Sequence, residues 1–181
     1  AVRGGFDIPL IYNSNGYDSV EALRLLDGVF DIYLPDFKYA GEEEAVELSE
    51  APGYPAAALA ALGEMFGQAG PLEVDSRGIA VRGVLVRHLV LPNDLARTSG
   101  VLAAIARVSP QIPVSLMAQY NPVHRAGEHA LLSRGLRESE YARAVEEMMR
   151  LGLTSGFVQD WRESPGELLP DFDRESPFGG S

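Results

Sequence analysis

The sequence contains no cysteine, only three histidines, and no long hydrophobic run. Without thiols the chain can form no disulfide, no thiolate nucleophile, no cysteine zinc site and no iron–sulfur cluster held by its own residues. The histidines are too scattered for their spacing to indicate a metal site. No apolar stretch reaches the roughly 18 residues that a membrane-spanning helix needs, so a membrane is not expected as a partner.

Basic residues are also few, 15 against 26 acidic ones, and the formal net charge is −11. A surface of this sign repels phosphate backbones, so nucleic acid is not an expected partner. The contents of 46% hydrophobic and 23% charged residues are ordinary for a globular chain of the cytoplasm. At 181 residues the chain is long enough for one domain with its own core. We expect this domain over residues 1–159, followed by an irregular tail at 160–181 that is rich in Pro, Asp and Glu.

Strand-like and helix-like segments alternate along the chain. The expected strands are at 7–12, 29–34, 84–91, 114–118 and near 155–158, with a small hairpin over 73–81. The expected helices are at 20–26, 42–50, 55–69, 98–107 and 138–150. This alternation predicts an α/β fold with a parallel sheet, and it fits a doubly wound sheet and a barrel equally well.

Polar side chains follow the predicted strands at the points where they end. They are Asn13, Ser14 and Asn15, then Asp36 and Lys38, and finally Gln119, Tyr120 and Asn121. Ligands of parallel α/β folds bind at the carboxyl ends of the strands, so these groups are candidates for a polar mouth. The first three residues also suit a plain turn.

Asp36 and Lys38 are two residues apart, so in an extended segment both side chains face the same way. Together they offer a carboxylate and an ammonium to a zwitterionic ligand such as an amino acid. Lys38 could instead form a Schiff base, as in an aldolase-like barrel. A third interpretation is an ion pair that only orders the loop.

Arg87 interrupts an otherwise apolar strand and is followed by His88, which has the opposite parity. A buried guanidinium needs an acidic partner or an anionic ligand, and a core ion pair would satisfy it as well as a ligand would. His88 is expected to pack beneath a helix. His124 and His129 are expected in loops.

The order and spacing of four segments resemble radical S-adenosylmethionine (SAM) proteins similar to pyruvate formate-lyase activating enzyme. The segments are Tyr-Asn-Ser-Asn-Gly-Tyr (12–17), Asp-Ile-Tyr-Leu-Pro-Asp-Phe-Lys-Tyr (31–39), Leu-Val-Arg-His-Leu-Val-Leu-Pro (85–92) and Ser-Leu-Met-Ala-Gln-Tyr-Asn-Pro (115–122). Gln-Asp-Trp (159–161) and Leu-Pro-Asp-Phe-Asp (169–173) resemble the longer bacterial branch. The resemblance covers nearly the whole chain, and Asp-Phe-Lys (36–38) is its most specific part.

The resemblance implies a partial (β/α)6 barrel, of which this chain would be the later half. In that family a Cys-x3-Cys-x2-Cys loop holds a [4Fe-4S] cluster, and SAM is cleaved reductively to a 5′-deoxyadenosyl radical that abstracts hydrogen from the substrate. A glycyl-radical enzyme is one implied partner. Neither the cysteine loop nor the Gly-Gly-Glu-like segment is present, so we expect a protein nearly twice as long, with this chain inactive by itself.

The resemblance also assigns cofactor-binding residues, while it places no catalytic or metal-binding residue in this chain. Asp36 and Lys38 match the pair near the methionine end of SAM. The further residues that it places near the cofactor are Asn13, Ser14, Asn15, Arg87 and Asn121, the last standing where activating enzymes carry a histidine. Two other interpretations stay open: an aldolase-like lyase that uses Lys38, and a non-catalytic binding remnant.

Overall fold

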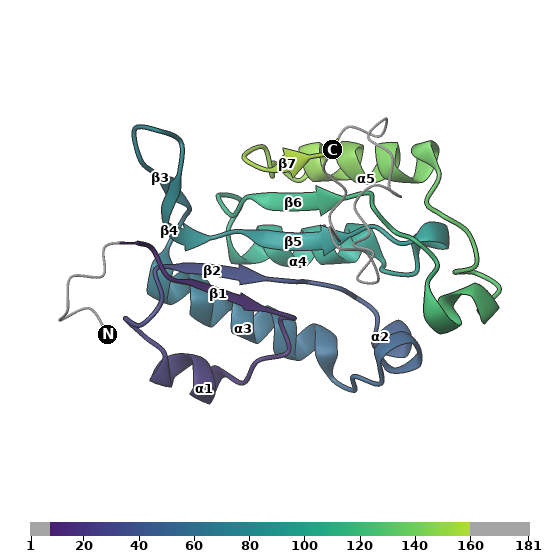
Figure 1. Ribbon diagram of the computed structural model, residues 1–181, viewed down its shortest axis with the longest axis horizontal. Helices are drawn as coiled ribbons and strands as arrows, with labels where there is room; N and C mark the ends of the chain where they lie inside the picture. Colours follow the sequence, from purple (N-terminus) through teal and green to yellow (C-terminus); the bar gives the residue numbers. More distant parts are fainter. Residues whose placement is uncertain (1–7, 160–181) are drawn as a thin grey trace, which may run out of the picture.

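The computed structural model describes residues 8–159, which form two adjoining, mainly parallel sheets with helices packed on one face (Figure 1). The predicted tail at 160–181, and with it most of the two tail segments of the resemblance, lies outside the described residues. Within 8–159, no helix has both the length and the apolar character to cross a membrane.

The parallel strands lie side by side in the order in which they occur along the chain. The first sheet has the order β1-β2-β4-β3 and the second has the order β5-β6-β7. Their bounds are β1 (Ile11–Ser14), β2 (Ile32–Pro35), β3 (Glu73–Val74), β4 (Ala80–Val84), β5 (Val86–Leu89), β6 (Val114–Met117) and β7 (Phe157–Val158). An isolated parallel bridge between Asp36 and Arg87 joins the two sheets.

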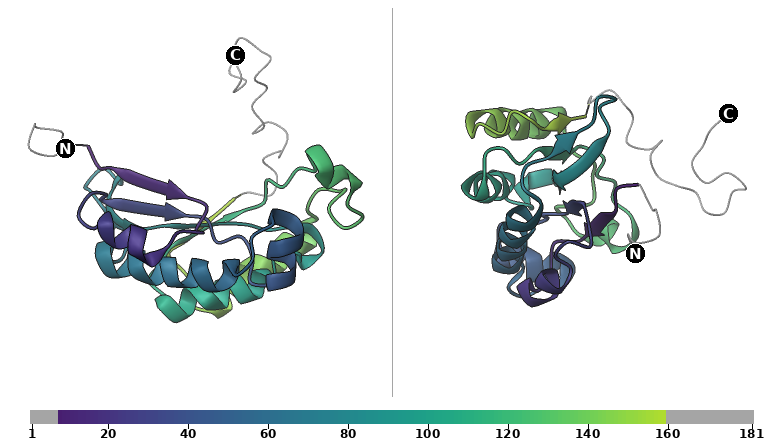
Figure 2. Two further views of the ribbon diagram at one scale, coloured as in Figure 1. Left: turned by 90° about the horizontal axis from the view of Figure 1, so that it is seen from below. Right: turned by 90° about the vertical axis from the view of Figure 1, so that its left-hand side faces the viewer.

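The helices lie together on one face of these sheets, and the opposite face is not covered by any helix within 8–159 (Figure 2). Their bounds are α1 (Val20–Leu25), α2 (Glu42–Ser49), α3 (Tyr54–Ala69), α4 (Thr98–Val108) and α5 (Glu138–Arg150), with the 3-10 turns η2 (Pro92–Asp94) and η3 (His124–Glu128). The α/β class with parallel strands is confirmed. The strands of the described residues form no closed barrel, and the helices do not cover both faces as in a doubly wound sheet.

The helices were predictable because their apolar residues recur at helical spacing. In α3 the buried residues include Ala58, Leu62 and Met65, which lie on one face of the helix. The predicted bounds of α5 are those found. The hairpin is confirmed as β3 and β4, whose turn is tied by Asp75 Oδ1 accepting from the amide of Ile79 at 2.9 Å.

The predicted strand at 84–91 is wrong in one respect. The chain pairs as two strands, β4 with β2 and β5 with β6. The amide of Leu85, between them, still donates to the carbonyl of Tyr33 at 3.0 Å. The apolar sequence is continuous across Leu85 and gives no sign of a break. The change of paired strand, from β2 to β6, is therefore set by where those strands lie in the sheets.

Candidate functional site

The pleat of β5 separates Arg87 from His88. Val86 and His88 are buried on the helix-covered side, whereas Arg87 and Leu89 are half-buried on the open face. The strand alternation therefore turns Arg87 away from the helices, as the opposite parity of the two residues predicted.

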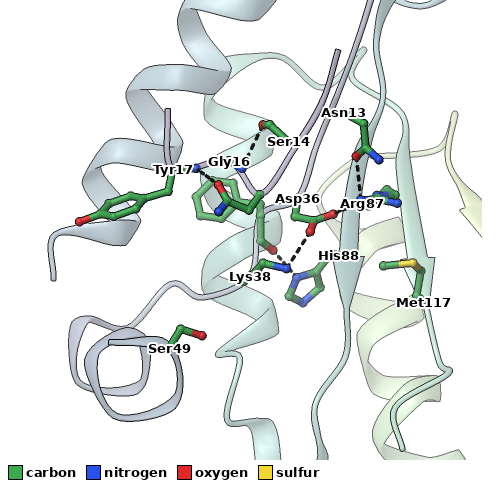
Figure 3. Close-up of polar contacts among 12 residues, drawn as sticks. Asn13, Ser14, Gly16, Tyr17, Asp36, Lys38, Ser49, Arg87, His88 and Met117 are labelled. Carbon is green, nitrogen blue, oxygen red and sulfur yellow. Dashed lines mark hydrogen bonds and ion pairs between the residues drawn. The ribbon is translucent and has the colours of Figure 1, made fainter. Parts of the chain in front are cut away.

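Arg87, Asp36, Lys38 and Asn13 form one hydrogen-bonded group on the open face, which we call the Asp36 cluster (Figure 3). The Arg87 guanidinium lies 2.8–2.9 Å from Asp36 Oδ1, and Lys38 Nζ lies 2.7 Å from Asp36 Oδ2. A second Arg87 nitrogen donates to Asn13 Oδ1 at 2.9 Å. Residues 74 positions apart thus meet at the carboxyl ends of β1 and β2 and along β5.

The Asp36 cluster carries a surplus positive charge. One carboxylate, 17% exposed, faces two cations, with Arg87 32% and Lys38 41% exposed. The group is therefore net positive on a chain of net charge −11. Lys38 has three ammonium protons, and the Asn13 amide carries two donor protons in addition to its engaged oxygen. These donors can receive an anionic group from the open face.

Ser14 and Asn15 do not join the Asp36 cluster, which corrects the expectation that residues 13–15 converge with it. Ser14 has the opposite pleat to Asn13, and its hydroxyl donates to Asp18 Oδ2 at 2.6 Å. The same hydroxyl accepts the amide of Gly16 at 3.1 Å. The Asn15 side chain turns back onto its own loop and accepts the amide of Tyr17 at 2.9 Å. Both residues serve the turn, which was the plainer interpretation.

His88 is a structural residue beneath α4, as predicted. Its Nδ1 lies 2.7 Å from the carbonyl oxygen of Phe37, and its Nε2 lies 3.0 Å from Thr98 Oγ1. The side chain is fully buried, and this burial lowers the pKa of His88 to about 4. The imidazole is therefore neutral near pH 7. Through its contact with the Phe37 carbonyl, it holds the backbone between Asp36 and Lys38 from the helix-covered side.

Asn121 lies in the loop that follows β6 and is half-buried. It comes from a different strand end than the members of the Asp36 cluster. Its neighbour Tyr120 is buried, and its hydroxyl donates to the carbonyl of Leu132 at 2.8 Å. His124 begins η3, whereas His129, as predicted, lies in an irregular segment. Among residues 8–159 no group of three or more acidic or histidine side chains is arranged to hold a metal ion.

One signal in the sequence was missed. Lys38 is the only lysine of the chain, because the other 14 of its 15 basic residues are arginines. Lysine presents a compact point charge with three rotatable donors, while arginine presents a planar fork. A chain that uses arginine elsewhere thus has its lysine at the end of β2, in the Asp36 cluster.

Comparison with known proteins gives one informative match. The chain is 32% identical over 144 residues to the uncharacterized protein MJ0674 of Methanocaldococcus jannaschii, and the match covers 77% of this chain. The chain spans 38% of the length of that relative. No protein-family model matches the chain, and no solved structure matches it.

Proposed function

We propose that this chain is part of a radical SAM enzyme, in which the Asp36 cluster holds the amino-acid end of SAM. The observation that carries the proposal is the meeting of Asn13, Asp36, Lys38 and Arg87 on one open face, at the carboxyl ends of β1 and β2 and along β5. Ligands of parallel α/β sheets bind at this edge. The surplus positive charge suits the carboxylate of an amino acid.

The donors of the Asp36 cluster fit such a ligand. Lys38 and Asn13 retain free N–H groups for the carboxylate of the methionine moiety. Asp36 Oδ1 already receives Arg87, while Oδ2 receives only Lys38 and keeps a lone pair for the ligand's ammonium. Asp36 therefore binds mainly its two neighbouring cations, and its remaining lone pair is available to the ligand.

An iron–sulfur cluster does not fit this chain, which has no cysteine to hold one. In the proposed enzyme the cluster belongs to another part of the protein, and SAM bound there supplies radical chemistry. The residues of this chain bind and orient the cofactor. The strand order and the helices on one face support the further proposal that the sheet is part of a partial (β/α) barrel. The resemblance alone suggests that the enzyme acts in the cytoplasm on a partner such as a glycyl-radical enzyme.

The aldolase-like alternative finds less support. A Schiff-base lysine is activated in an apolar pocket or beside another cationic group. The Lys38 amine is 41% exposed and lies 2.7 Å from the Asp36 carboxylate, which offsets the charge of the neighbouring Arg87. Trapping of a carbonyl substrate on Lys38 by borohydride would restore this alternative.

The test of the proposal uses the single lysine. Labelling with 15N-lysine gives one backbone amide signal, that of Lys38. We expect this signal to move when SAM is added to the full chain, and to move much less with decarboxylated SAM, which lacks the carboxylate. Arg87→Gln should weaken SAM binding by about tenfold, because it removes the cation that holds Asp36 and Asn13 and reduces the positive charge of the site.

Arg107→Gln is the matched control, because it removes one positive charge from an exposed position on α4. It should leave SAM binding unchanged. Equal responses to the two ligands, or no response to either, would overturn the proposed function.

A further inference from the structure

Tyr54 is a buried phenol that lies directly beneath the Asp36 cluster. It is the first residue of α3 and is 2% exposed. Its burial raises the pKa of Tyr54 far above the ordinary value for tyrosine. The side chain is therefore a neutral hydroxyl with one proton to donate.

The Tyr54 hydroxyl joins two strand-end loops. It accepts the backbone amide of Lys38 at 2.9 Å and donates to the carbonyl of Asn15 at 2.9 Å. The carbonyl of Asp36 lies 3.2 Å away as an alternative acceptor. These are main-chain groups on both sides of the Asp36 cluster, so a single hydroxyl fixes the loop after β1 relative to the loop after β2.

Aromatic neighbours hold the phenol in place. The Tyr54 ring lies 5.7 Å from the ring of Tyr17, 5.8 Å from that of Tyr39 and 6.4 Å from that of Phe37, between centroids. These separations are those of favourable tilted and edge contacts. The hydroxyl therefore presents a rigid anchor to the two loops.

We propose that Tyr54 is the positioning residue of the Asp36 cluster, and that it sets the separation of Lys38 and Asn13 to match the carboxylate of an amino acid. This inference rests on the proposed function and adds a residue that does not touch the ligand. Asn13 lies in β1, whereas Lys38 lies in the segment that follows β2. A displacement of that segment would therefore separate the two donors.

Tyr141 offers a matched control. It is a buried phenol on α5 that donates to the carbonyl of Leu116 at 2.8 Å and accepts the amide of Gln159 at 2.9 Å. It thus also bridges main-chain groups of two segments, at β6 and beyond β7, away from the Asp36 cluster. Tyr141→Phe and Tyr54→Phe remove the same hydroxyl and should lower the melting temperature comparably.

The experiment measures SAM affinity in the full chain through the 15N signal of Lys38, for both variants. Tyr54→Phe should weaken SAM binding by about fivefold to tenfold, the size expected when one buried amide loses its acceptor. Tyr141→Phe should bind SAM as the unmodified chain does. The amide of Lys38 should also exchange its hydrogen faster in Tyr54→Phe, and not in Tyr141→Phe.

An affinity in Tyr54→Phe equal to that in Tyr141→Phe would overturn the positioning role. Failure of the proposed function looks different, because the unmodified chain would then not respond to SAM at all. In that case the positioning role is tested without ligand. The Lys38 amine is methylated with a 13C label, and its 13C signal is compared between the unmodified chain and the two variants. A signal unchanged by Tyr54→Phe would reject the positioning role, and a signal shifted there but not in Tyr141→Phe would support it.

Discussion

Arg87 and Asp36 are joined twice, once through the main chain and once through their side chains. Their backbones form the isolated parallel bridge that connects the two sheets, and the Arg87 guanidinium lies 2.8–2.9 Å from Asp36 Oδ1. Within this bridge the amide of Phe37 donates to the carbonyl of Arg87 at 2.9 Å. The Asp36 cluster therefore lies at the point where the two sheets join.

Asp36→Asn should accordingly destabilise the fold as well as the site. Two cations would lose their shared counter-charge in a half-buried setting, and we expect the free energy of unfolding to fall by about 1–3 kcal/mol. Urea denaturation measures this loss. Asp27→Asn, at an exposed position, is the control and should cost less than about 0.5 kcal/mol. Equal losses in the two variants would contradict the structural role of the Asp36 ion pairs.

His88 should make the stability depend on pH. Its pKa is about 4 in the folded chain, below the ordinary value of 6.5, so the unfolded chain binds the proton more readily. The stabilisation is present above pH 6.5 and is lost as the pH falls towards 4. Between pH 7 and pH 5 the loss from this group should be about 2 kcal/mol.

The measurement is the free energy of unfolding against pH in the unmodified chain and in His88→Gln. The variant cannot take up this proton. Its free energy of unfolding should therefore change less between pH 7 and pH 5, even if it is lower at both pH values. Parallel curves would show that His88 does not titrate as its burial requires.

Local patterns in the sequence were sufficient for the helices and for the parity of β5. Residues 138–150 carry their apolar residues at helical spacing, and Arg87 and His88 fall on opposite sides because strand side chains alternate. The strand ends likewise placed Asp36 and Lys38 at the correct edge of the sheet. These features depend on neighbouring residues only.

The rest depended on contacts between distant segments. Nothing near Tyr54 indicates that its hydroxyl reaches Asn15, 39 positions earlier. The first strand was expected at 7–12, whereas pairing with β2 places it at Ile11–Ser14, so that Asn13 and Ser14 lie within the strand and on opposite sides of it. The pairing of Asp36 with Arg87, 51 positions apart, likewise required the assembled sheet.

Glu140 should stabilise the loop that follows β5. Its two carboxylate oxygens accept the amides of Asn93 at 2.8 Å and Arg137 at 2.9 Å, and both also receive the Arg134 guanidinium at 2.8 Å. Arg134 lowers the pKa of Glu140 to about 2. The stabilisation is therefore present above about pH 4.5, the ordinary range of a glutamate, and is lost as the pH falls towards 2.

Glu140→Gln should lower the free energy of unfolding at pH 7 by about 1–3 kcal/mol, since the amide cannot accept all four bonds. Urea denaturation at pH 7 gives the value. The comparison is Glu138→Gln, an exposed glutamate in the first turn of the same helix. A Glu140→Gln variant as stable as Glu138→Gln would mean that this network contributes no stability.

Gly16 lies in the loop after β1 and packs tightly against the backbone of Asp36, which follows β2. Its φ is +78°, and a Cβ atom there would stand 2.1 Å from the carbonyl oxygen of Asp36. Gly28 has nearly the same φ, +73°, with no atom within 4 Å of the corresponding position. Alanine at either position pays the same conformational cost of about 1–2 kcal/mol, so the difference between the two variants isolates the contact.

We expect Gly16→Ala to lose at least about 1 kcal/mol more than Gly28→Ala in urea denaturation, because the backbone of Asp36 must move away. The same movement should shift the 15N signal of Lys38 in Gly16→Ala and leave it in place in Gly28→Ala. If the two variants were equally stable and gave the same Lys38 signal, the loops after β1 and β2 would not be in the close contact on which the Asp36 cluster depends.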